Sequence, residues 1–234
     1  METGLARRTF LGAAGAAGAA VVAGLAAAAE APAQPVAGGI KIIGVSCSPR
    51  QGKTTAAALE VALNAAKAVG PNVEVELIDL AGLNIPGCVA AGLPVPAGQQ
   101  DDFLKVAPKL ADPKVAGLIV GSPVYFGTMS SLAKAFIERL MAFRQRDFAL
   151  SNKVAGALAV GGARNGGQEL VVQSIETALL CQEMIVVGDG RPGGRFGATL
   201  WSQNNDITGD EFGLASARNL GRRVAEVALR LAAR

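Results

Sequence analysis

The stretch IKIIGVSCSPRQGKTT, at residues 40–55, contains the pattern that decides the fold. Its first six residues are apolar except for Lys41 and predict a short buried β-strand. The Ser, Pro and Gly residues that follow predict a loop, and apolar side chains at helical spacing after it predict a helix that ends at Gly70 and Pro71. This strand, loop and helix predict the first unit of an α/β domain.

Similar units follow along the chain. Short apolar runs predict further strands at residues 73–79, 115–121, 154–160 and 184–187, and helical patterns occur at 101–111, 130–144, 167–181 and 210–234. An irregular stretch rich in Gly and Pro lies at 81–100. Five strands separated by helices predict a doubly wound, five-stranded parallel sheet with helices on both faces. Such sheets bind ligands beyond the carboxyl ends of their strands, so the candidate loops are 46–55, 122–129 and 161–168.

The composition excludes several classes of protein. The 234 residues are 50% hydrophobic and 18% charged, which excludes intrinsic disorder. The formal charge of +3 arises from 22 basic and 19 acidic residues without a long basic block, so we expect no nucleic-acid partner. The chain contains no histidine, which excludes histidine bases, histidine metal ligands and Ser-His-Asp triads. Three cysteines are too few for a disulfide framework or a four-cysteine cluster, and no metal site is predicted.

The first residues predict an export signal. The sequence RRTFLG at residues 7–12 precedes an uncharged run rich in Ala, Gly and Val, and small residues at 31–33 supply a cleavage pattern. We therefore expect a twin-arginine signal at residues 1–33, a linker at 34–39 and one domain at 40–234. The signal predicts export to the periplasm or another extracytoplasmic space. An uncleaved signal that anchors the chain is the alternative, because the uncharged run is long enough to span a bilayer.

The loop after the first predicted strand carries groups that bind anions. Arg50, Lys53, several hydroxyls and free backbone N–H groups meet there at a predicted helix start, which favours a phosphate. A capped polar turn is the structural alternative. Residues 52–54, GKT, also end a near P-loop, and Asp79 lies at a strand end, as the magnesium site of an NTPase requires. Because Cys47 stands where a P-loop needs glycine, an NTPase is the less favoured alternative.

The other two candidate loops suit a planar ligand. In the loop at 122–129, Pro and Gly favour an irregular backbone, and Tyr125 and Phe126 could flank a ring. Either aromatic residue could instead belong to the core or to an interface between subunits. The loop at 161–168 has four glycines, so its N–H groups could approach the polar edge of a ligand. Together the three loops predict one flat, phosphorylated ligand.

These loops resemble a known family. Residues 47–55, 121–127 and 161–169, with 185–188 and 217–221, are similar to the flavodoxin-like NADPH-dependent FMN reductases and iron–sulfur flavoproteins, and the resemblance covers residues 39–234. It implies a sheet of order 2-1-3-4-5, bound FMN, NAD(P)H as electron donor, and a homodimer or homotetramer. Iron–sulfur members carry several cysteines in the segment equivalent to 85–102. This chain has only Cys88 there, so no cluster is expected.

The resemblance also implies which residues hold the cofactor. The loop implied to hold the FMN phosphate contains Ser48, Arg50, Gln51, Gly52, Lys53, Thr54 and Thr55, with Thr54 standing where many members have Asn. The residues implied to border the ring are Pro123, Val124, Tyr125, Phe126 and Gly127. Those implied near the pyrimidine edge or at a subunit contact are Gly161, Gly162, Asn165 and Gly166. Because the flavin carries the chemistry, no catalytic side chain is predicted.

The function predicted on this basis is electron transfer through FMN. We expect an NAD(P)H-dependent oxidoreductase that passes electrons to a quinone, a flavin or another small-molecule or protein acceptor. The export signal favours an alternative, a non-enzymatic FMN electron carrier, because NAD(P)H is not expected to be freely available outside the inner membrane. Cys47 lies at a helix start that favours a thiolate, but phosphate is expected in the same loop, so no redox role is predicted for it. Cys88 and Cys181 are expected to be ordinary packed or loop residues.

Overall fold

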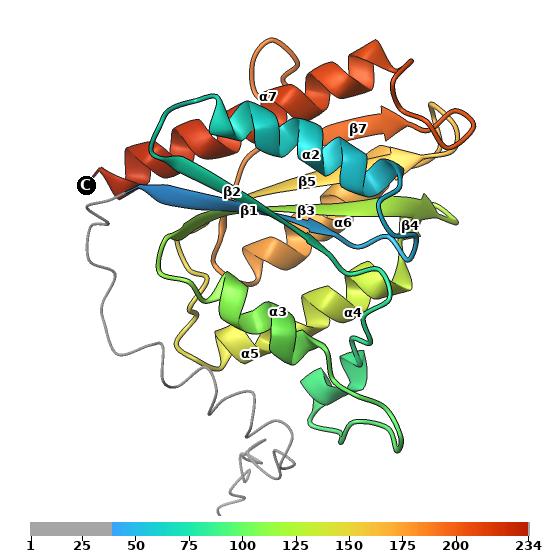
Figure 1. Ribbon diagram of the computed structural model, residues 1–234, viewed down its shortest axis with the longest axis vertical. Coiled ribbons are helices and arrows are strands. Elements are labelled where there is room, and N and C mark those ends of the chain that lie inside the picture. Colours follow the sequence, from blue (N-terminus) through green and yellow to red (C-terminus); the bar gives the residue numbers. More distant parts are fainter. Residues whose placement is uncertain (1–38, 234) are drawn as a thin grey trace, which may run out of the picture.

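The structure is a computed structural model that describes residues 39–233 (Figure 1). The expected export signal at 1–33 and nearly all of the linker at 34–39 lie outside the described residues. Within the described part of the chain, no helix has both the length and the apolar character needed to cross a bilayer.

A parallel sheet forms the centre of the molecule (Figure 1). Its strands lie in the order β2-β1-β3-β5-β6, and β7 also pairs in parallel with β5. A short strand, β4, pairs antiparallel with β3. The strands are β1 (Ile40–Ser46), β2 (Val73–Asp79), β3 (Val115–Tyr125), β4 (Thr128–Met129), β5 (Val154–Gly161), β6 (Ile185–Val186) and β7 (Ala198–Trp201). The parallel α/β sheet is therefore confirmed, but the prediction of five strands is wrong, because the sheet has seven.

One of the two extra strands, β7, lies at the edge of the sheet, where β5 pairs first with β6, the strand predicted at 184–187, and then with β7. β6 pairs with the start of β5, through Ile185 and Val154, and β7 pairs with its end, through Trp201 and Gly161. Between them the chain leaves the sheet at residues 187–197. Two hydrogen bonds close this excursion: the Arg195 N–H donates to Asp189 Oδ1 at 2.6 Å, and the Asp189 N–H donates to the Arg195 carbonyl at 3.1 Å.

Helices cover both faces of the sheet, as predicted (Figure 1). One face is covered by α2 (Thr54–Lys67) and α7 (Glu211–Ala232), which share an apolar core with residues such as Ile42, Leu59 and Leu220. The other face carries the 3-10 helix η1 (Gly87–Ala91), α3 (Phe103–Leu110), α4 (Ser131–Arg139), α5 (Met141–Arg144) and α6 (Gln168–Leu180). The helix expected at 130–144 is thus divided at Leu140.

The helices α2 and α7 pack with their backbones in contact. A Cβ atom added at Gly221 of α7 would lie 1.8 Å from the Ala62 carbonyl oxygen of α2, so only glycine fits at this crossing. α7 also packs on β3, β5 and β7, and thus holds α2 against the sheet.

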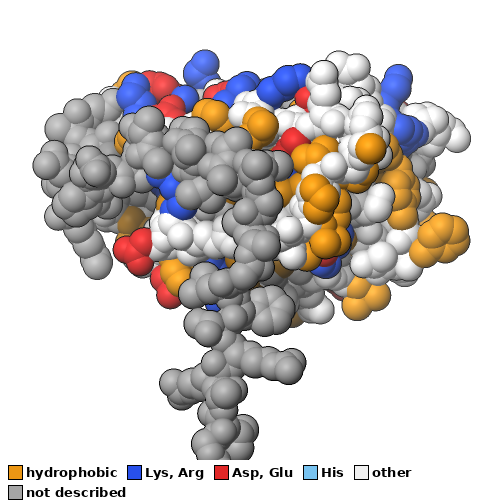
Figure 2. All heavy atoms as spheres, turned by 90° about the horizontal axis from the view of Figure 1, so that it is seen from below, with side chains coloured by type: hydrophobic (Ala, Val, Ile, Leu, Met, Phe, Trp, Pro, Cys, Tyr) orange, Lys and Arg blue, Asp and Glu red, His pale blue; other side chains and the backbone are white. Residues whose placement is uncertain are grey.

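A buried ion pair anchors the irregular segment at 81–102. The Arg139 guanidinium of α4 donates to both carboxylate oxygens of Asp101, at 2.7 and 2.6 Å, and lies 4.6 Å from the ring centroid of Phe103. Both side chains of the pair are at most 5% exposed. Bidentate pairing of this kind fixes geometry as well as charge, so it orients α4 and the segment relative to each other. Figure 2 shows the side of the molecule with α3 and α4, where basic, acidic and hydrophobic side chains are interspersed.

Candidate functional site

The three candidate loops meet at the carboxyl ends of the strands, because β1, β3 and β5 are parallel neighbours in the sheet. The first loop joins the second where the Ser130 hydroxyl donates to the Cys47 carbonyl at 2.7 Å. The second joins the third where Gly167 lies against Gly127; a Cβ atom on Gly167 would be 3.2 Å from the Gly127 Cα. The structure therefore brings together the predicted residues of all three loops.

The first loop leaves the N-terminus of α2 open. The residue before the helix, Lys53, makes no side-chain hydrogen bond to it, so N–H groups of the first turn have no side-chain cap. Arg50, Gln51, Gly52 and Lys53 are exposed, whereas the hydroxyl residues Ser48, Thr54 and Thr55 are buried. An open helix N-terminus flanked by two cations attracts an anion.

Two contacts shape this first loop, and the sequence did not predict either. The Gly52 N–H donates to Asp79 Oδ2 at 2.9 Å, which holds Gly52 in its left-handed conformation of φ 61°. Asp79 thus contacts the loop itself. On the other side, Arg50 Nη1 donates to Asn205 Oδ1 at 2.6 Å, so the turn after β7 lies against the loop. The position of Asp79 at the end of a strand beside β1 was the only available signal for its contact.

Cys47 lies beneath the first loop and is fully buried. Burial, reinforced by the nearby Asp79 carboxylate, raises the pKa of its thiol above the ordinary value. The thiol is therefore protonated at neutral pH, and the thiolate that a helix N-terminus would favour does not form.

The second loop is a β-hairpin, which the sequence reading did not foresee. β3 continues through Pro123 and Val124 to Tyr125, and β4 returns alongside it. The tip is a two-residue turn at Phe126 and Gly127, both with positive φ, of 51° and 76°. Phe126 is fully exposed and Tyr125 partly so, which excludes the alternative that they belong to the core of the chain. A bulky residue held at positive φ in full solvent exposure is strained, as is common at functional sites.

The third loop is organised by a buried side chain that was not predicted. Gln168 accepts a hydrogen bond from the Gly166 N–H at 2.9 Å and donates to the carbonyls of Ala163 and Leu200 at 2.6 and 3.2 Å. A Cβ atom on Gly161 would lie 2.5 Å from Gln168 Nε2, so a larger residue at position 161 would clash with the Gln168 side-chain amide. Gly162 and Asn165 remain exposed on the loop.

The cysteines do not fit an iron–sulfur cluster. Cys47 is buried, Cys88 is partly buried and Cys181 is exposed. Among residues 39–233, no three side chains of His, Cys, Asp or Glu lie close enough to share a metal ion. A cluster needs about four thiolates, and the chain has three cysteines in separate places.

The parallel sheet, the open helix N-terminus and the loops beyond its strands define a flavodoxin-like protein. Residues 40–195 match the model of the family described as NADPH-dependent FMN reductase. The chain belongs to this family and is accordingly an oxidoreductase that uses FMN, with NAD(P)H as the fitting donor.

Individual relatives agree with this assignment. An iron–sulfur flavoprotein of Methanocaldococcus jannaschii is 40% identical over 192 residues, which cover 80% of this chain and 97% of that protein. An NAD(P)H dehydrogenase (quinone) of Paracoccus denitrificans is 34% identical over 168 residues, 64% of this chain and 79% of that one. The structure of a WrbA-like flavodoxin from Agrobacterium tumefaciens shares the fold, with a TM-score of 0.55 and 17% identity over 82% of this chain and 98% of that chain.

Proposed function

We propose that the first loop binds the phosphate of FMN and that the ring lies across the second and third loops. One observation carries this proposal: the N-terminus of α2 is open, flanked by Arg50 and Lys53, and connected to both other loops. The buried hydroxyls of Ser48, Thr54 and Thr55 supply further polar contacts beside the open N–H groups. A dianionic phosphate fits this set of donors.

The other two loops orient the ring in this proposal. The strand end and hairpin at Pro123, Val124, Tyr125, Phe126 and Gly127 border it, while the backbone at Gly161, Gly162, Asn165 and Gly166 lies at its pyrimidine edge. N–H donors at that edge stabilise the negative charge of the reduced ring. The flavin itself supplies acceptance of hydride and onward electron transfer. The side chains of these loops bind and orient, and none serves as an acid or base.

We propose that the acceptor is a quinone. Relatives named as quinone dehydrogenases support this proposal, and so does the hairpin, which presents Tyr125 and Phe126 to solvent beside the site. Exposed aromatic side chains offer a flat apolar ligand a surface on which to stack.

The test uses the visible spectrum of the FMN-loaded protein. Flavin bands that bleach with NADPH under anaerobic conditions and return with 1,4-benzoquinone support the proposed oxidoreductase. Bands that bleach only with dithionite would instead favour the electron carrier. A colourless protein that takes up no added FMN would contradict both, and binding of ATP with magnesium would then favour an NTPase. Arg50→Gln should weaken FMN uptake, whereas Lys67→Gln, at the other end of α2, should not.

We further propose that the chain is exported by the twin-arginine pathway to a periplasmic or other extracytoplasmic space and assembles as a homodimer or homotetramer. The paired arginines at residues 7 and 8 support the first part. Replacing both by lysine should retain the protein in the cytoplasm, as cell fractionation would show. Light scattering of the mature protein measures its oligomeric state, and a monomer would contradict the proposed homodimer or homotetramer.

A further inference from the structure

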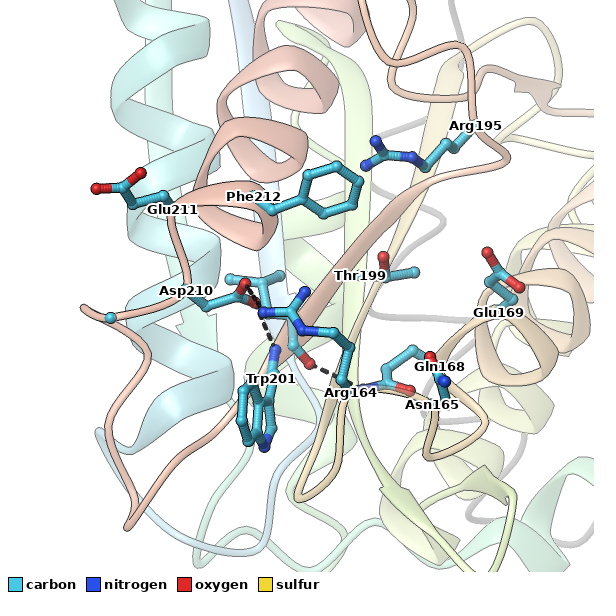
Figure 3. A pocket seen from close by; sticks show the side chains of 12 residues that line it. Arg164, Asn165, Gln168, Glu169, Arg195, Thr199, Trp201, Asp210, Glu211 and Phe212 are labelled. Carbon is cyan, nitrogen blue, oxygen red and sulfur yellow. Dashed lines mark hydrogen bonds and ion pairs between the residues drawn. The ribbon is translucent and has the colours of Figure 1, made fainter.

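A cavity of about 600 Å³ lies beside the proposed flavin site and shares the third loop with it (Figure 3). Its floor is the edge strand β7, and its walls are the N-terminal ends of α6 and α7. This volume is within the range of pockets that hold small ligands. The third loop forms part of the wall through Arg164 and Asn165, so one loop borders both the cavity and the proposed pyrimidine edge of the flavin.

Each of two arginines in the lining is stacked on an aromatic ring. The Arg164 Cζ atom lies 5.1 Å from the centroid of Trp201, and the Arg195 Cζ atom lies 3.8 Å from that of Phe212 (Figure 3). Arg164 is paired with Asp210 at 2.8 Å. By contrast, the Arg195 guanidinium makes no hydrogen bond or ion pair with any other residue among 39–233. The cavity therefore holds a cation whose hydrogen-bond donors are all available, beside an aromatic ring that is 54% exposed.

Acidic groups in the lining leave this positive charge accessible. Both oxygens of Asp210 are engaged, one by Arg164 and the other by the Trp201 N–H at 2.7 Å. Glu211 also lines the cavity, but its side chain points away from Arg195 in Figure 3. Glu169, on α6, is the remaining acidic side chain of the lining. It lies on the wall opposite α7, the helix that carries Phe212 (Figure 3).

The floor of the cavity does not accept an additional strand. The outward N–H groups of β7 are already bonded, that of Thr199 to Ser216 Oγ at 3.2 Å and that of Trp201 to Asp210 Oδ2. Peptides that add a strand to a sheet need such groups free. This excludes an added strand, while the exposed aromatic ring and the guanidinium of Arg195 suit a compact ligand with a planar group and an anion.

We infer that this cavity binds the 2′-phosphoadenosine half of NADPH, an inference that rests on the proposed function. Arginine binds phosphate through two parallel hydrogen bonds, and Arg195 has its donors free for the 2′-phosphate. An arginine in this role selects NADPH over NADH, as in other dinucleotide sites. The adenine stacks on the exposed face of Phe212 or Trp201. Because Arg164 belongs to the third loop, the same loop places the nicotinamide half toward the flavin.

The experiment compares two probes on the FMN-loaded protein by titration calorimetry: adenosine 2′,5′-bisphosphate and adenosine 5′-monophosphate. The bisphosphate should bind at least about 10-fold more tightly, the effect of a charge-assisted bidentate contact. Arg195→Gln should remove this difference and raise the KM for NADPH with kcat unchanged, while the KM for NADH changes little. Arg191→Gln is the matched control, because Arg191 is an exposed arginine of the same excursion outside the cavity lining.

Three results would overturn the inference: equal binding of the two probes, an Arg195→Gln variant that still prefers the bisphosphate, or an Arg191→Gln variant with the same loss. Inorganic phosphate that binds as tightly as the bisphosphate would reduce the cavity to a simple anion site and also overturn it. The proposed function fails separately, since a protein without FMN, or one whose flavin bands NADPH does not bleach, contradicts that proposal. An unchanged flavin spectrum shows that each variant is folded and loaded.

Discussion

The helices α2 and α4 both begin beside the carboxyl ends of the parallel strands, but their N-termini differ in how they are capped. At the start of α4, the Ser130 hydroxyl accepts a hydrogen bond from the Ala133 N–H at 3.0 Å, a standard side-chain cap. At the start of α2, Lys53 makes no such bond, and the helix is left open. A capped helix has its polar groups satisfied within the fold, whereas an open one keeps them for a ligand. The difference separates a structural helix start from a binding one on local evidence alone.

A third helix start lies between these two cases. Asp210 precedes α7, and its carboxylate makes no side-chain cap of standard geometry. Its two oxygens accept hydrogen bonds from Trp201 and Arg164, although the Gly213 N–H of α7 also lies near it. This carboxylate therefore stabilises the strand β7 and the third loop more than its own helix. The start of α2 is therefore open, that of α4 is capped, and that of α7 is diverted, because its carboxylate bonds residues outside the helix. We expect each of the three to respond differently to substitution.

The largest effect is expected from closing the open helix. Lys53→Asp supplies an acceptor to the first-turn N–H groups and reverses the charge beside the proposed phosphate, so FMN affinity should fall at least about 100-fold. Titration of the FMN-free protein, followed by quenching of flavin fluorescence, measures this change. Lys67→Asp, at the other end of α2, should bind FMN as the wild type does. An unchanged dissociation constant for FMN in Lys53→Asp would show that the open N-terminus of α2 does not bind the FMN phosphate.

The diverted start gives the next effect. Burial alone would raise the pKa of Asp210, but the Trp201 N–H, the Arg164 guanidinium and the Gly213 N–H together outweigh it and hold that pKa below the usual value. A carboxylate with a lowered pKa stabilises the fold above its unfolded-state pKa, and the stabilisation is lost as pH falls through the folded-state pKa. Asp210→Asn should therefore lower the free energy of unfolding by about 1–2 kcal/mol at pH 7.

The difference between Asp210→Asn and wild type should shrink in acid, below about pH 4. Urea unfolding at pH 7 and at low pH measures both parts. The control is Glu211→Gln, because Glu211 is the exposed next residue. A gap that stays constant with pH would contradict the role assigned to the carboxylate.

The capped start should give a smaller loss. Ser130→Ala removes the cap of α4 and the bond to the Cys47 carbonyl, so the free energy of unfolding should fall by about 1 kcal/mol. Its effect on FMN affinity should be much smaller than that of Lys53→Asp. Chemical unfolding of the FMN-free protein measures the loss, and Ser131→Ala, on the exposed neighbour, should be neutral. If Ser130→Ala weakened FMN binding as strongly as Lys53→Asp, the distinction between the two helix starts would not hold.

The smallest expected effect is a gain in stability at the hairpin. Phe126 has positive φ in a turn where Asn followed by Gly is favoured, so Phe126→Asn should stabilise the fold by about 0.5 kcal/mol. Thermal unfolding detects the gain, while Tyr125→Asn, in the adjacent strand, should destabilise. Slower flavin reoxidation by quinone in Phe126→Asn would indicate that the aromatic residue is kept for function. A variant neither more stable nor slower would leave no role for the strain.

Much of the fold could be predicted because its strands are short, apolar and separated by strong helical patterns. The first four parallel strands lie where the sequence indicated, although β3 continues to Tyr125, beyond its predicted end at residue 121. The edge strand β7 was missed because it has four residues and follows an excursion rich in Gly and Arg. Its outward N–H groups donate to the side chains of Ser216 and Asp210, and no local sequence pattern predicts such contacts.

The site was predictable in its loops but not in its supports. Glycines, hydroxyls and cations within one loop are visible in the sequence, and they indicated the anion site. Asp79, Gln168 and Asp210 act across the fold, on residues 27, 32 and 46 positions away. Contacts of this kind depend on how the strands and helices pack, which periodicity does not encode. The hairpin was missed for a related reason, because Pro123 and Gly127 suggested irregular backbone where β3 continues.

The contact between Gly221 and Ala62 has a consequence for how the protein is made. α2 supplies the open helix start, but it packs against α7, the last element of the described chain. During synthesis, the ribosome has released α2 long before it releases α7. The proposed FMN phosphate site at the start of α2 therefore lacks this packing until α7 has been translated. Loading of the cofactor becomes a post-translational event, and a chain truncated before α7 should leave the ribosome without colour.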